Sequence, residues 1–391
     1  MNKLLFISND SKPSEEKYNY IGEEKLTNFS IPIVKACETI GLEVTIGINR
    51  RFADKMTCRY PVHFFNAQIY RNPFNIKEVM RAYRNVCNEL NKGEYIGIHC
   101  NTPIGGVVGR LAGKKCGIQK VIYTAHGFHF YKGAPIINWL LYYPIEQWLA
   151  HYTDVLITIN QEDYERAKKF HLRNHGKVYY VPGVGIDTKC QIITEETRLK
   201  KREEIGVPKD ALLLISVGDL NKNKNNRIII EALKRIDDNI HYILCGEGPL
   251  LTELTEAARP IKDRVHFLGY RTDIKELLAA SDIFVMPSFR EGLSRSLMEA
   301  MVAGLPCIVS RIRGNTDLIE RKELLCSPDR VDEFVDAIRS LDESKDIRSE
   351  IGEENNKRVQ KYSETVVIEK ITQIYKEEFR VSTDVKKEAS E

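Results

Sequence analysis

Short apolar runs alternate with helical periodicities along the first half of the chain. Six short, mainly apolar runs have the length of buried parallel strands, at residues 4–8, 44–48, 95–99, 121–124, 155–159 and 177–181. Stretches with the helical spacing of apolar positions lie between some of them, at residues 33–40, 78–90 and 161–170. Strands that alternate with helices predict a parallel α/β sheet.

The pattern breaks and then restarts in the second half. Residues 183–208 are polar and charged, and we place a hinge there. Five further strand-like runs follow at 212–217, 240–245, 265–268, 283–286 and 307–309, with helical stretches at 226–236, 250–258, 274–280 and 294–302. The sequence therefore predicts an α/β fold of two doubly wound, Rossmann-like domains, 1–190 and 191–364, that face a central cleft. The amphipathic stretch 365–379 is expected to pack back across the first domain, ahead of a polar, frayed tail that ends at residue 391.

Composition narrows the class of protein. The 391 residues are 42% hydrophobic and 29% charged, with a formal net charge of +3, which excludes a disordered or fibrous chain. No apolar run reaches the ~18–20 residues of a membrane span, and the N-terminus lacks the pattern of a signal peptide. The nine cysteines are scattered and without CxxC spacing, as expected for reduced thiols in a cytoplasmic protein.

Charge is distributed unevenly along the chain. Residues 1–190 hold 25 Lys and Arg against 17 Asp and Glu, a net of +8, whereas residues 191–391 hold 33 against 38, a net of −5. A basic first half suggests an anionic partner or surface, and unselected scatter explains the same asymmetry. Both interpretations stay open at this point.

The loops that follow strands are where open α/β sheets bind ligands. After the strand at 212–217, Gly218 is followed by two lysines ahead of a helix, and Lys224 with the free amide groups of that helix would suit a phosphate. A solvated turn is the commoner explanation when this loop is taken alone. The Gly-rich turn 245–249 is not a G-x-G-x-x-G fingerprint, which counts against an NAD enzyme.

The block after the strand at 283–286 carries the strongest signal. Glu291 lies in a strand-to-helix loop, and Glu299 is eight residues on, about two turns into the expected helix and facing roughly the same way. Gly292, Leu293 and Ser294 place free N–H groups at the helix start, which suits a diphosphate. Carboxylates on either side of an anion site suit a nucleotide sugar, and a capping carboxylate with a solvated helix Glu is the structural alternative.

A fourth loop, at residues 124–135, lies in the first domain. It holds two histidines, three aromatic residues and a lysine directly after a strand. We expect His129 to be packed, as a lone histidine usually is. For His126, which precedes a glycine and shares its loop with these groups, we favour a functional role.

Taken together, these residues resemble glycosyltransferase family 4, the retaining enzymes of the GT-B fold. The resemblance covers nearly the whole chain and is closest to members that build bacterial capsules and exopolysaccharides. It rests on the Glu291-x7-Glu299 block, the Gly218…Lys224 loop and His126. It also rests on the segments YTAHGFHFYKGAP, NWLLYYPIEQWLA, YTDVLITIN, VGDLNKNKN and REGLSRSLMEAM.

The resemblance implies a role for each residue at a matching position. His126 would contact the transferred sugar near its anomeric centre, Glu291 would bind the sugar hydroxyls, and Lys224 would neutralise the diphosphate. Glu299 would hold the ribose hydroxyls of the donor. The remaining donor-binding positions are Gly105, Gly106, Gly218, Tyr270, Arg271, Gly292, Leu293 and Ser294.

Two of these assignments concern loops. Gly105 and Gly106, in the loop after the strand that ends at Cys100, would let the backbone approach the phosphates. Gly269, Tyr270 and Arg271 would lie near the nucleotide base.

One position departs from the family pattern. Asp219 stands where many members have an arginine that pairs with the diphosphate, so Lys222, Arg290 or Arg295 would have to substitute, and Asp219 would orient one of the lysines or have no such role.

The resemblance also implies the reaction. No D-x-D occurs in the sequence, so we expect no metal and no other cofactor, with cationic side chains and helix dipoles stabilising the leaving diphosphate. The donor would be a UDP-sugar carrying an N-acetylhexosamine or a hexose. Retention would proceed by front-face attack assisted by the departing phosphate, and domain closure about the hinge would exclude water.

The acceptor implied by the resemblance is a saccharide, often one linked to a polyprenyl diphosphate in the membrane. The basic first half would suit peripheral contact with the anionic inner face of the cytoplasmic membrane. An interfacial patch could form from Trp139, Leu140, Leu141, Tyr142, Tyr143 and Trp148. Of these, we expect Leu140 and Leu141 to belong to the core and leave the aromatic residues open.

Other classes of function make different demands. An epimerase of the same architecture would bind a nucleotide sugar without an acceptor, and a donor-only incubation would reveal it. A non-catalytic binding protein would have lost His126, Glu291 or Glu299, all of which are present. A phosphorylase would carry pyridoxal phosphate, and nucleic-acid binding lacks a recognisable basic–aromatic module.

Overall fold

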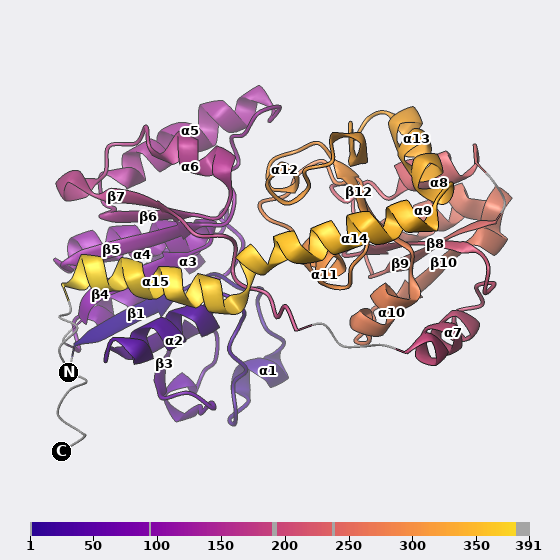
Figure 1. Cartoon of the computed structure of the whole chain (residues 1–391). Helices are drawn as coiled ribbons and strands as arrows, with labels where there is room; N and C mark the ends of the chain where they lie inside the picture. Colours follow the sequence, from indigo (N-terminus) through magenta and orange to yellow (C-terminus); the bar gives the residue numbers. More distant parts are fainter. Residues whose placement is uncertain (1, 94, 190–193, 237–238, 381–391) are drawn as a thin grey trace, which may run out of the picture. The chain divides into compact units, whose positions relative to one another are not determined.

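The computed structural model describes residues 2–93, 95–189, 194–236 and 239–380 (Figure 1). The chain divides into two compact units, the first spanning Met1–Gly185 with Glu364–Glu391 and the second Ile186–Ser363. The predicted boundary between residues 190 and 191, Cys190 and the predicted polar tail from 381 to 391 lie outside the described residues.

A seven-stranded parallel sheet forms the centre of the first unit, in the order β3-β2-β1-β4-β5-β6-β7. Its strands are β1 (Lys3–Ile7), β2 (Glu43–Ile48), β3 (Val62–Asn66), β4 (Tyr95–Asn101), β5 (Lys120–Ala125), β6 (Val155–Thr158) and β7 (Lys177–Tyr180). In the register of the central strands, Leu5 lies opposite Thr45 on one side and Ile98 on the other. The central strands are predominantly apolar and mostly buried, as expected for a parallel sheet covered on both faces.

Helices cover both faces of this sheet. One face packs against α3 (Ile76–Leu90), α4 (Pro103–Lys115), α5 (Ile136–Ala150) and α6 (Gln161–Ala167). The other packs against α2 (Ser30–Thr39) and α15 (Glu364–Phe379), and a short α1 (Glu15–Asn19) precedes α2. The return of the last helix to the first unit, next to α2, is as predicted (Figure 1).

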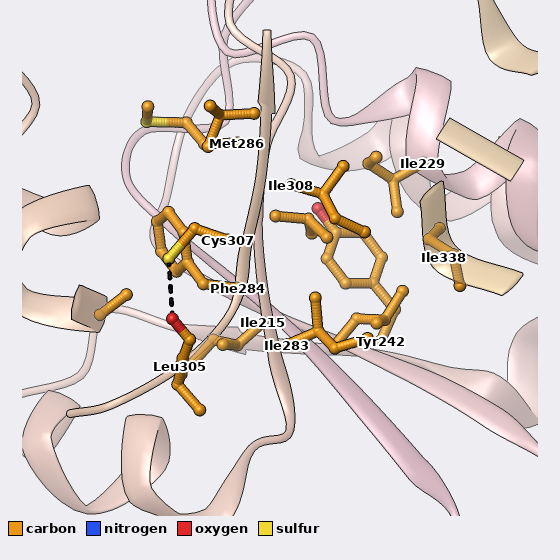
Figure 2. Packing of buried hydrophobic residues seen from close by; sticks show 14 of the residues in the cluster. Ile215, Ile229, Tyr242, Ile283, Phe284, Met286, Leu305, Cys307, Ile308 and Ile338 are labelled. Atoms are coloured by element: carbon orange, nitrogen blue, oxygen red, sulfur yellow. Dashed lines mark hydrogen bonds between the residues drawn. The ribbon is translucent and has the colours of Figure 1, made fainter. Parts of the chain in front are cut away.

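The second unit contains a six-stranded parallel sheet in the order β10-β9-β8-β11-β12-β13. Its strands are β8 (Leu212–Val217), β9 (Ile240–Cys245), β10 (Val265–Gly269), β11 (Ile283–Met286), β12 (Cys307–Ser310) and β13 (Leu325–Cys326). Figure 2 shows Phe284 and Ile308 on the central strands, with Tyr242 from β9 in the same core. The Tyr242 hydroxyl is buried and donates to Ser216 Oγ at 2.7 Å, which satisfies the one polar atom of this ring.

Eight helices belong to the second unit in the described part of the chain: α7 (Glu195–Glu204), α8 (Arg227–Leu233), α9 (Leu251–Ala258), α10 (Ile274–Ala280), α11 (Arg295–Val302), α12 (Asn315–Leu318), α13 (Val331–Asp342) and α14 (Lys345–Val359). Short 3₁₀ turns occur at Ala53–Lys55, Arg173–His175, Arg259–Arg264, Lys322–Leu324 and Gln360–Tyr362. Both units are doubly wound parallel sheets, so the predicted fold class is confirmed.

The polar stretch in which we placed the hinge contains a helix, α7, that the sequence pattern did not predict. Arg202 is buried and donates to the carbonyls of Ala280 and Ala211, and it pairs with Asp282. Arg198 pairs with the same carboxylate, Nη2 to Oδ1, at 2.7 Å. Because arginines rather than an apolar stripe anchor α7, its charged sequence has the appearance of a linker.

Helix α5 corrects the prediction for Leu140 and Leu141. These side chains are 69% and 49% exposed, so they are not core residues. The inward side of α5 is instead formed by Trp139, Tyr142 and Tyr143, which pack against the core of the first unit. The helix is apolar on both sides, so periodicity alone did not show which side faces the sheet. Among the described residues, no helix has both the length and the hydropathy to cross a bilayer.

Candidate active-site residues

The loops that follow β8 and β11 lie side by side, because these strands are neighbours in a parallel sheet and their carboxyl ends share one edge. The backbone N–H of Phe289 donates to the Asn223 carbonyl at 2.8 Å, and the Asn223 side-chain amide donates to the Arg290 carbonyl at 2.9 Å. Asn225, with a positive φ of 54°, donates from Nδ2 to the Pro287 carbonyl. The loop that carries Lys224 and the loop that carries Glu291 are thus fixed to one another.

This contact brings Lys224 and Glu291 together. Lys224 Nζ lies 2.8 Å from Glu291 Oε1, and both side chains are mostly buried, at 21% and 14% exposed. Gly218 makes room for the lysine: its φ is +147°, and an added Cβ would lie 3.1 Å from Lys224 Cε. A mostly buried ammonium group next to a carboxylate can exchange that partner for an anionic ligand.

The segment Gly292–Ser294 leads directly into α11. Ser294 is the N-cap residue, and its Oγ accepts from the Leu297 N–H. Within the described part of the chain, the amide groups of Gly292, Leu293 and Ser294 have no acceptor. Gly314 packs so closely that an added Cβ would lie 2.1 Å from the Gly292 carbonyl oxygen, and Arg313 Nε donates to the Glu291 carbonyl at 3.2 Å. The contacts with Arg313 and Gly314 fix the loop, and the three amide groups are available to a ligand.

Glu299 lies only about one turn into α11, because the helix begins at Arg295; our expectation of two turns was wrong. Its carboxylate accepts from Arg295 Nε at 2.9 Å. Glu299 also lines a cavity of about 430 Å³ with Thr272 and Lys275. The structure therefore places Glu291 against Lys224 and Glu299 at a neighbouring cavity beside α10.

Tyr270 and Arg271 follow β10 and differ in how free they are. The Tyr270 side chain is 75% exposed, whereas Arg271 is bound by Asp273 at 2.6 Å and Glu204 at 2.7 Å. The hydrogen bond from Arg271 holds the pKa of Asp273 well below its usual range. The guanidinium group is occupied, so of these two side chains Tyr270 is the one available to a base.

The Asp219 side chain is exposed and has no ion-pair partner among the described residues. It does not orient Lys224, which pairs with Glu291. Of the possible substitutes for the family arginine, Arg295 is paired with Glu299, while the side chains of Lys222 and Arg290 are exposed and have no partner within the described ranges.

In the first unit, His126 follows β5 and has an unusual environment. Both ring nitrogens are buried without a hydrogen-bond partner in the described part of the chain, and the ring lies edge-on to Phe29 at 4.6 Å. Burial lowers the pKa of the imidazole to about 4. His126 shares a cavity of about 20 Å³ with Asn101, whose buried Oδ1 is also unpartnered, and with Thr124. A neutral imidazole here can donate one hydrogen bond and accept another.

We expect Gly105 and Gly106 in a loop, but the structure places them in the first turn of α4, which begins at Pro103. An added Cβ on Gly105 would lie 3.1 Å from Ser8 Cα, and one on Gly106 would lie 2.5 Å from the Tyr123 ring. The missing side chains let α4 pack tightly on β1 and β5. The strand β4 extends to Asn101, so only Thr102, with a φ of 66°, separates it from the helix.

Sequence reasoning missed a buried chain of side chains beside His126. The Tyr375 hydroxyl from α15 lies 2.5 Å from His99 Nδ1, and His99 Nε2 lies 2.7 Å from Thr124 Oγ1. Tyr375 is 276 residues from His99, so no local pattern connects them. The available signal was a histidine within the otherwise apolar run 95–99.

His99 gives a testable pH dependence. Burial, and then the neighbouring His126, lower the pKa of His99 to about 3, against about 6.5 in an unfolded chain. The stability contributed by neutral His99 is therefore present above pH ~6.5 and is lost as the pH falls towards 3, by about 1.4 kcal/mol per pH unit. We expect the free energy of unfolding, measured with urea at several pH values in this range, to fall less steeply with decreasing pH in His99→Asn than in the unaltered chain.

Two variants serve as controls for this measurement. Tyr375→Phe removes the hydroxyl but keeps the buried imidazole, so it should lower stability by about 1 kcal/mol and leave the pH slope unchanged. His63→Asn changes an exposed position on β3 and should change neither. A slope for His99→Asn equal to that of the unaltered chain would contradict the assignment.

Two family models match the chain. The model described as "Glycosyl transferase 4-like" matches residues 24–160, and the one described as "Glycosyl transferases group 1" matches residues 197–358. EpsD of Bacillus subtilis, itself named only as a candidate glycosyltransferase, is 35% identical over 357 residues, which is 89% of this chain and 92% of that protein. An Escherichia coli protein is 29% identical over 323 residues, 80% of this chain and 83% of its own. It is named UDP-Gal:alpha-D-GlcNAc-diphosphoundecaprenol alpha-1,3-galactosyltransferase.

Solved structures resemble the fold. HepE of Anabaena in complex with UDP and glucose superposes with a TM-score of 0.73 at 20% identity, covering 96% of this chain and 99% of that one. Sucrose-phosphate synthase of Thermosynechococcus elongatus gives a TM-score of 0.78 at 18% identity, covering 98% and 100%. At these identities the likeness establishes the architecture of the chain.

Proposed function

The chain belongs to the group 1 and 4-like glycosyltransferases, and from this premise we propose that it transfers a sugar from a UDP-sugar to a saccharide acceptor in the synthesis of a surface polysaccharide. The sugar is an N-acetylhexosamine or a hexose. The acceptor is a lipid-linked or growing saccharide, reached at the inner face of the cytoplasmic membrane. The observation that carries the proposal is the Lys224–Glu291 pair next to the unpaired amides that precede α11.

The chemistry of these groups fits the departure of a nucleoside diphosphate. Lys224 and the amide groups at the start of α11 supply positive charge where the leaving phosphate becomes negative. Once Lys224 pairs with the diphosphate instead of Glu291, the Glu291 carboxylate can accept hydrogen bonds from the hydroxyl groups of the sugar. In this proposal the positive charge comes from the chain itself, and the anomeric configuration is retained through front-face attack.

The remaining residues recognise the ends of the donor. The Glu299 carboxylate accepts hydrogen bonds from the ribose hydroxyls, and Tyr270 lies beside the base. His126 takes hydroxyls of the transferred sugar, because a neutral imidazole both donates and accepts hydrogen bonds. The choice of UDP is supported by the UDP-bound neighbour from Anabaena and by the Escherichia coli relative, whose name gives UDP-Gal as its donor.

Ligand-dependent unfolding tests the donor site. A nucleotide that binds only the folded chain, at about 100 times its dissociation constant, adds ~2.7 kcal/mol to the free energy of unfolding. We expect UDP and one of UDP-N-acetylglucosamine or UDP-glucose to raise the unfolding temperature, GDP to have no effect, and Glu299→Ala to abolish the shift.

The control variant is Glu256→Ala, which removes an exposed carboxylate of the second unit and should keep the full shift. No shift with any nucleotide, in protein shown to be folded, would overturn the proposal. Product analysis without an acceptor separates transfer from epimerisation: a transferase leaves the sugar of the donor unchanged.

A further inference from the structure

The outward side of α5 is apolar, which is the reverse of a helix on the surface of a water-exposed domain. We define the outer face of α5 as its exposed large apolar residues: Ile136, Ile137, Leu140, Leu141, Ile145 and Trp148. Ile136 is 78% exposed. Isolated apolar residues on a surface are ordinary, but six on one helix form a patch that indicates an interaction.

The helix itself is firmly attached on its other side. Trp139 and Tyr143 pack on Phe130, and the Arg166 guanidinium lies 4.8 Å from the Trp139 ring. Glu146, the one acidic residue of α5, is bound by Arg110. The packing of the inner side therefore keeps the outer face turned away from the core of the first unit. No charged residue interrupts the helix from Ile136 to Ile145.

The outer face begins at the edge of the sheet that carries His126. A helix that connects parallel strands starts at their carboxyl edge and runs back along the sheet. Since α5 starts ten residues after His126, its first turns lie at the edge where the candidate catalytic histidine lies. Phe128 and Phe130 of the connecting loop are buried and stacked, which fixes this arrangement.

Positive charge is in excess in the part of the sequence that contains α5. Residues 71–151 hold ten Lys and Arg against four Asp and Glu. Lys132 is exposed just before α5. On the same face of the sheet, α3 and α4 form an apolar groove of about 510 Å³ lined also by Lys114 and Lys115. Apolar side chains among an excess of cations match a surface that is both apolar and anionic.

We propose that the outer face of α5 docks on an anionic lipid bilayer, with Ile136, Leu140 and Leu141 inserted at the interface. This inference rests on the proposed function, because it brings the His126 edge of the first unit to the surface where a lipid-linked acceptor would be presented. A second copy of the chain is a less favourable partner for this face than an anionic bilayer, since two such basic surfaces would repel each other.

Vesicle binding by the full chain tests the proposal, and the chain supplies its own probe. Both of its tryptophans, Trp139 and Trp148, lie in α5. We expect co-sedimentation with phosphatidylcholine vesicles that contain about one third phosphatidylglycerol, a blue shift of the tryptophan emission, and weaker binding to phosphatidylcholine alone. The double variant Leu140→Ser/Leu141→Ser should bind about tenfold more weakly.

The matched control replaces two exposed aliphatic residues of the second unit, Leu251→Ser/Ile347→Ser, and should bind as the unaltered chain does. Absence of binding to the anionic vesicles, or equal binding by the Leu140/Leu141 variant, would overturn the proposal. So would a concentration-dependent oligomer that this variant abolishes, since the face would then join two copies. The nucleotide-induced unfolding shift is independent of vesicles, so its persistence would show that only the membrane contact had failed.

Discussion

Replacement of Lys224 by alanine is expected to lower the turnover of sugar transfer by about 100- to 1,000-fold. The ammonium group lies 2.8 Å from Glu291, in a mostly buried position next to amides that have no acceptor within the described residues. A charge placed where negative charge develops in the transition state contributes most when it is fixed in advance and shielded from water. The measurement is the steady-state rate with a UDP-sugar that produces the unfolding shift.

Lys262→Ala provides the matched control for this prediction. Lys262 is an exposed lysine of the second unit to which no role in the donor site is assigned. We expect less than about a threefold change in turnover for this variant, as for most exposed charges. Equal losses in the two variants would mean that the Lys224 ammonium group is not what the reaction requires.

Glu291→Gln extends the test to the partner of the lysine. Residues in direct contact do not have additive effects, because each substitution already breaks the shared interaction. We therefore expect the double variant Lys224→Ala/Glu291→Gln to be about as slow as the slower single variant. Multiplied losses would indicate that the two groups act on separate parts of the donor.

The strands and the loops between them could be predicted because their signals are local. Runs such as residues 212–217 and 283–286 are short and almost wholly apolar, which is typical of strands buried on both faces. Since parallel strands share one carboxyl edge, the sequence was enough to assign Lys224 and Glu291 to loops on the same side of the sheet. The helix at 294–302 was predicted to within one residue, but the depth of Glu299 in it was not, because the eight-residue spacing from Glu291 includes loop residues that precede Arg295.

What the sequence did not show depends on contacts between distant segments. Helix α7 is anchored by Arg198 and Arg202 on Asp282, about 80 residues away, so its own pattern resembles a linker. The Tyr375–His99 contact likewise joins the last helix to β4. In α5 the error had another origin: apolar residues lie on both sides, and the inward pairing of Glu146 with Arg110 joins residues 36 positions apart, which no local pattern shows.

The Arg110–Glu146 pair is the basis of the second large effect that we expect. Arg110 is 1% exposed and holds Glu146 through two hydrogen bonds, of 2.7 and 3.2 Å. Its guanidinium carbon also lies 4.0 Å from the centre of the Tyr123 ring, and its Nε donates to the Gly106 carbonyl. Removing one partner of a buried pair leaves the other charge uncompensated, which costs about 3–5 kcal/mol.

We therefore expect Arg110→Ala to lower the unfolding temperature of the first unit by about 6–20 °C, at roughly 2–4 °C per kcal/mol for a unit of this size. Scanning calorimetry measures this shift directly. Lys177→Ala, which breaks an exposed pair with Glu377 in the same unit, should change the free energy of unfolding by less than about 1 kcal/mol.

The double variant Arg110→Met/Glu146→Leu separates charge from packing. If the uncompensated Glu146 carboxylate causes the loss, replacing both partners by apolar side chains of similar volume should recover most of the stability, because a buried pair is often worth no more than such a replacement. A double variant as unstable as Arg110→Ala would instead assign the loss to the Tyr123 and Gly106 contacts of the guanidinium group. In that case Arg110 stabilises the packing of α4 on the sheet through its contact with Tyr123 and its hydrogen bond to Gly106, and the pairing with Glu146 adds little to stability.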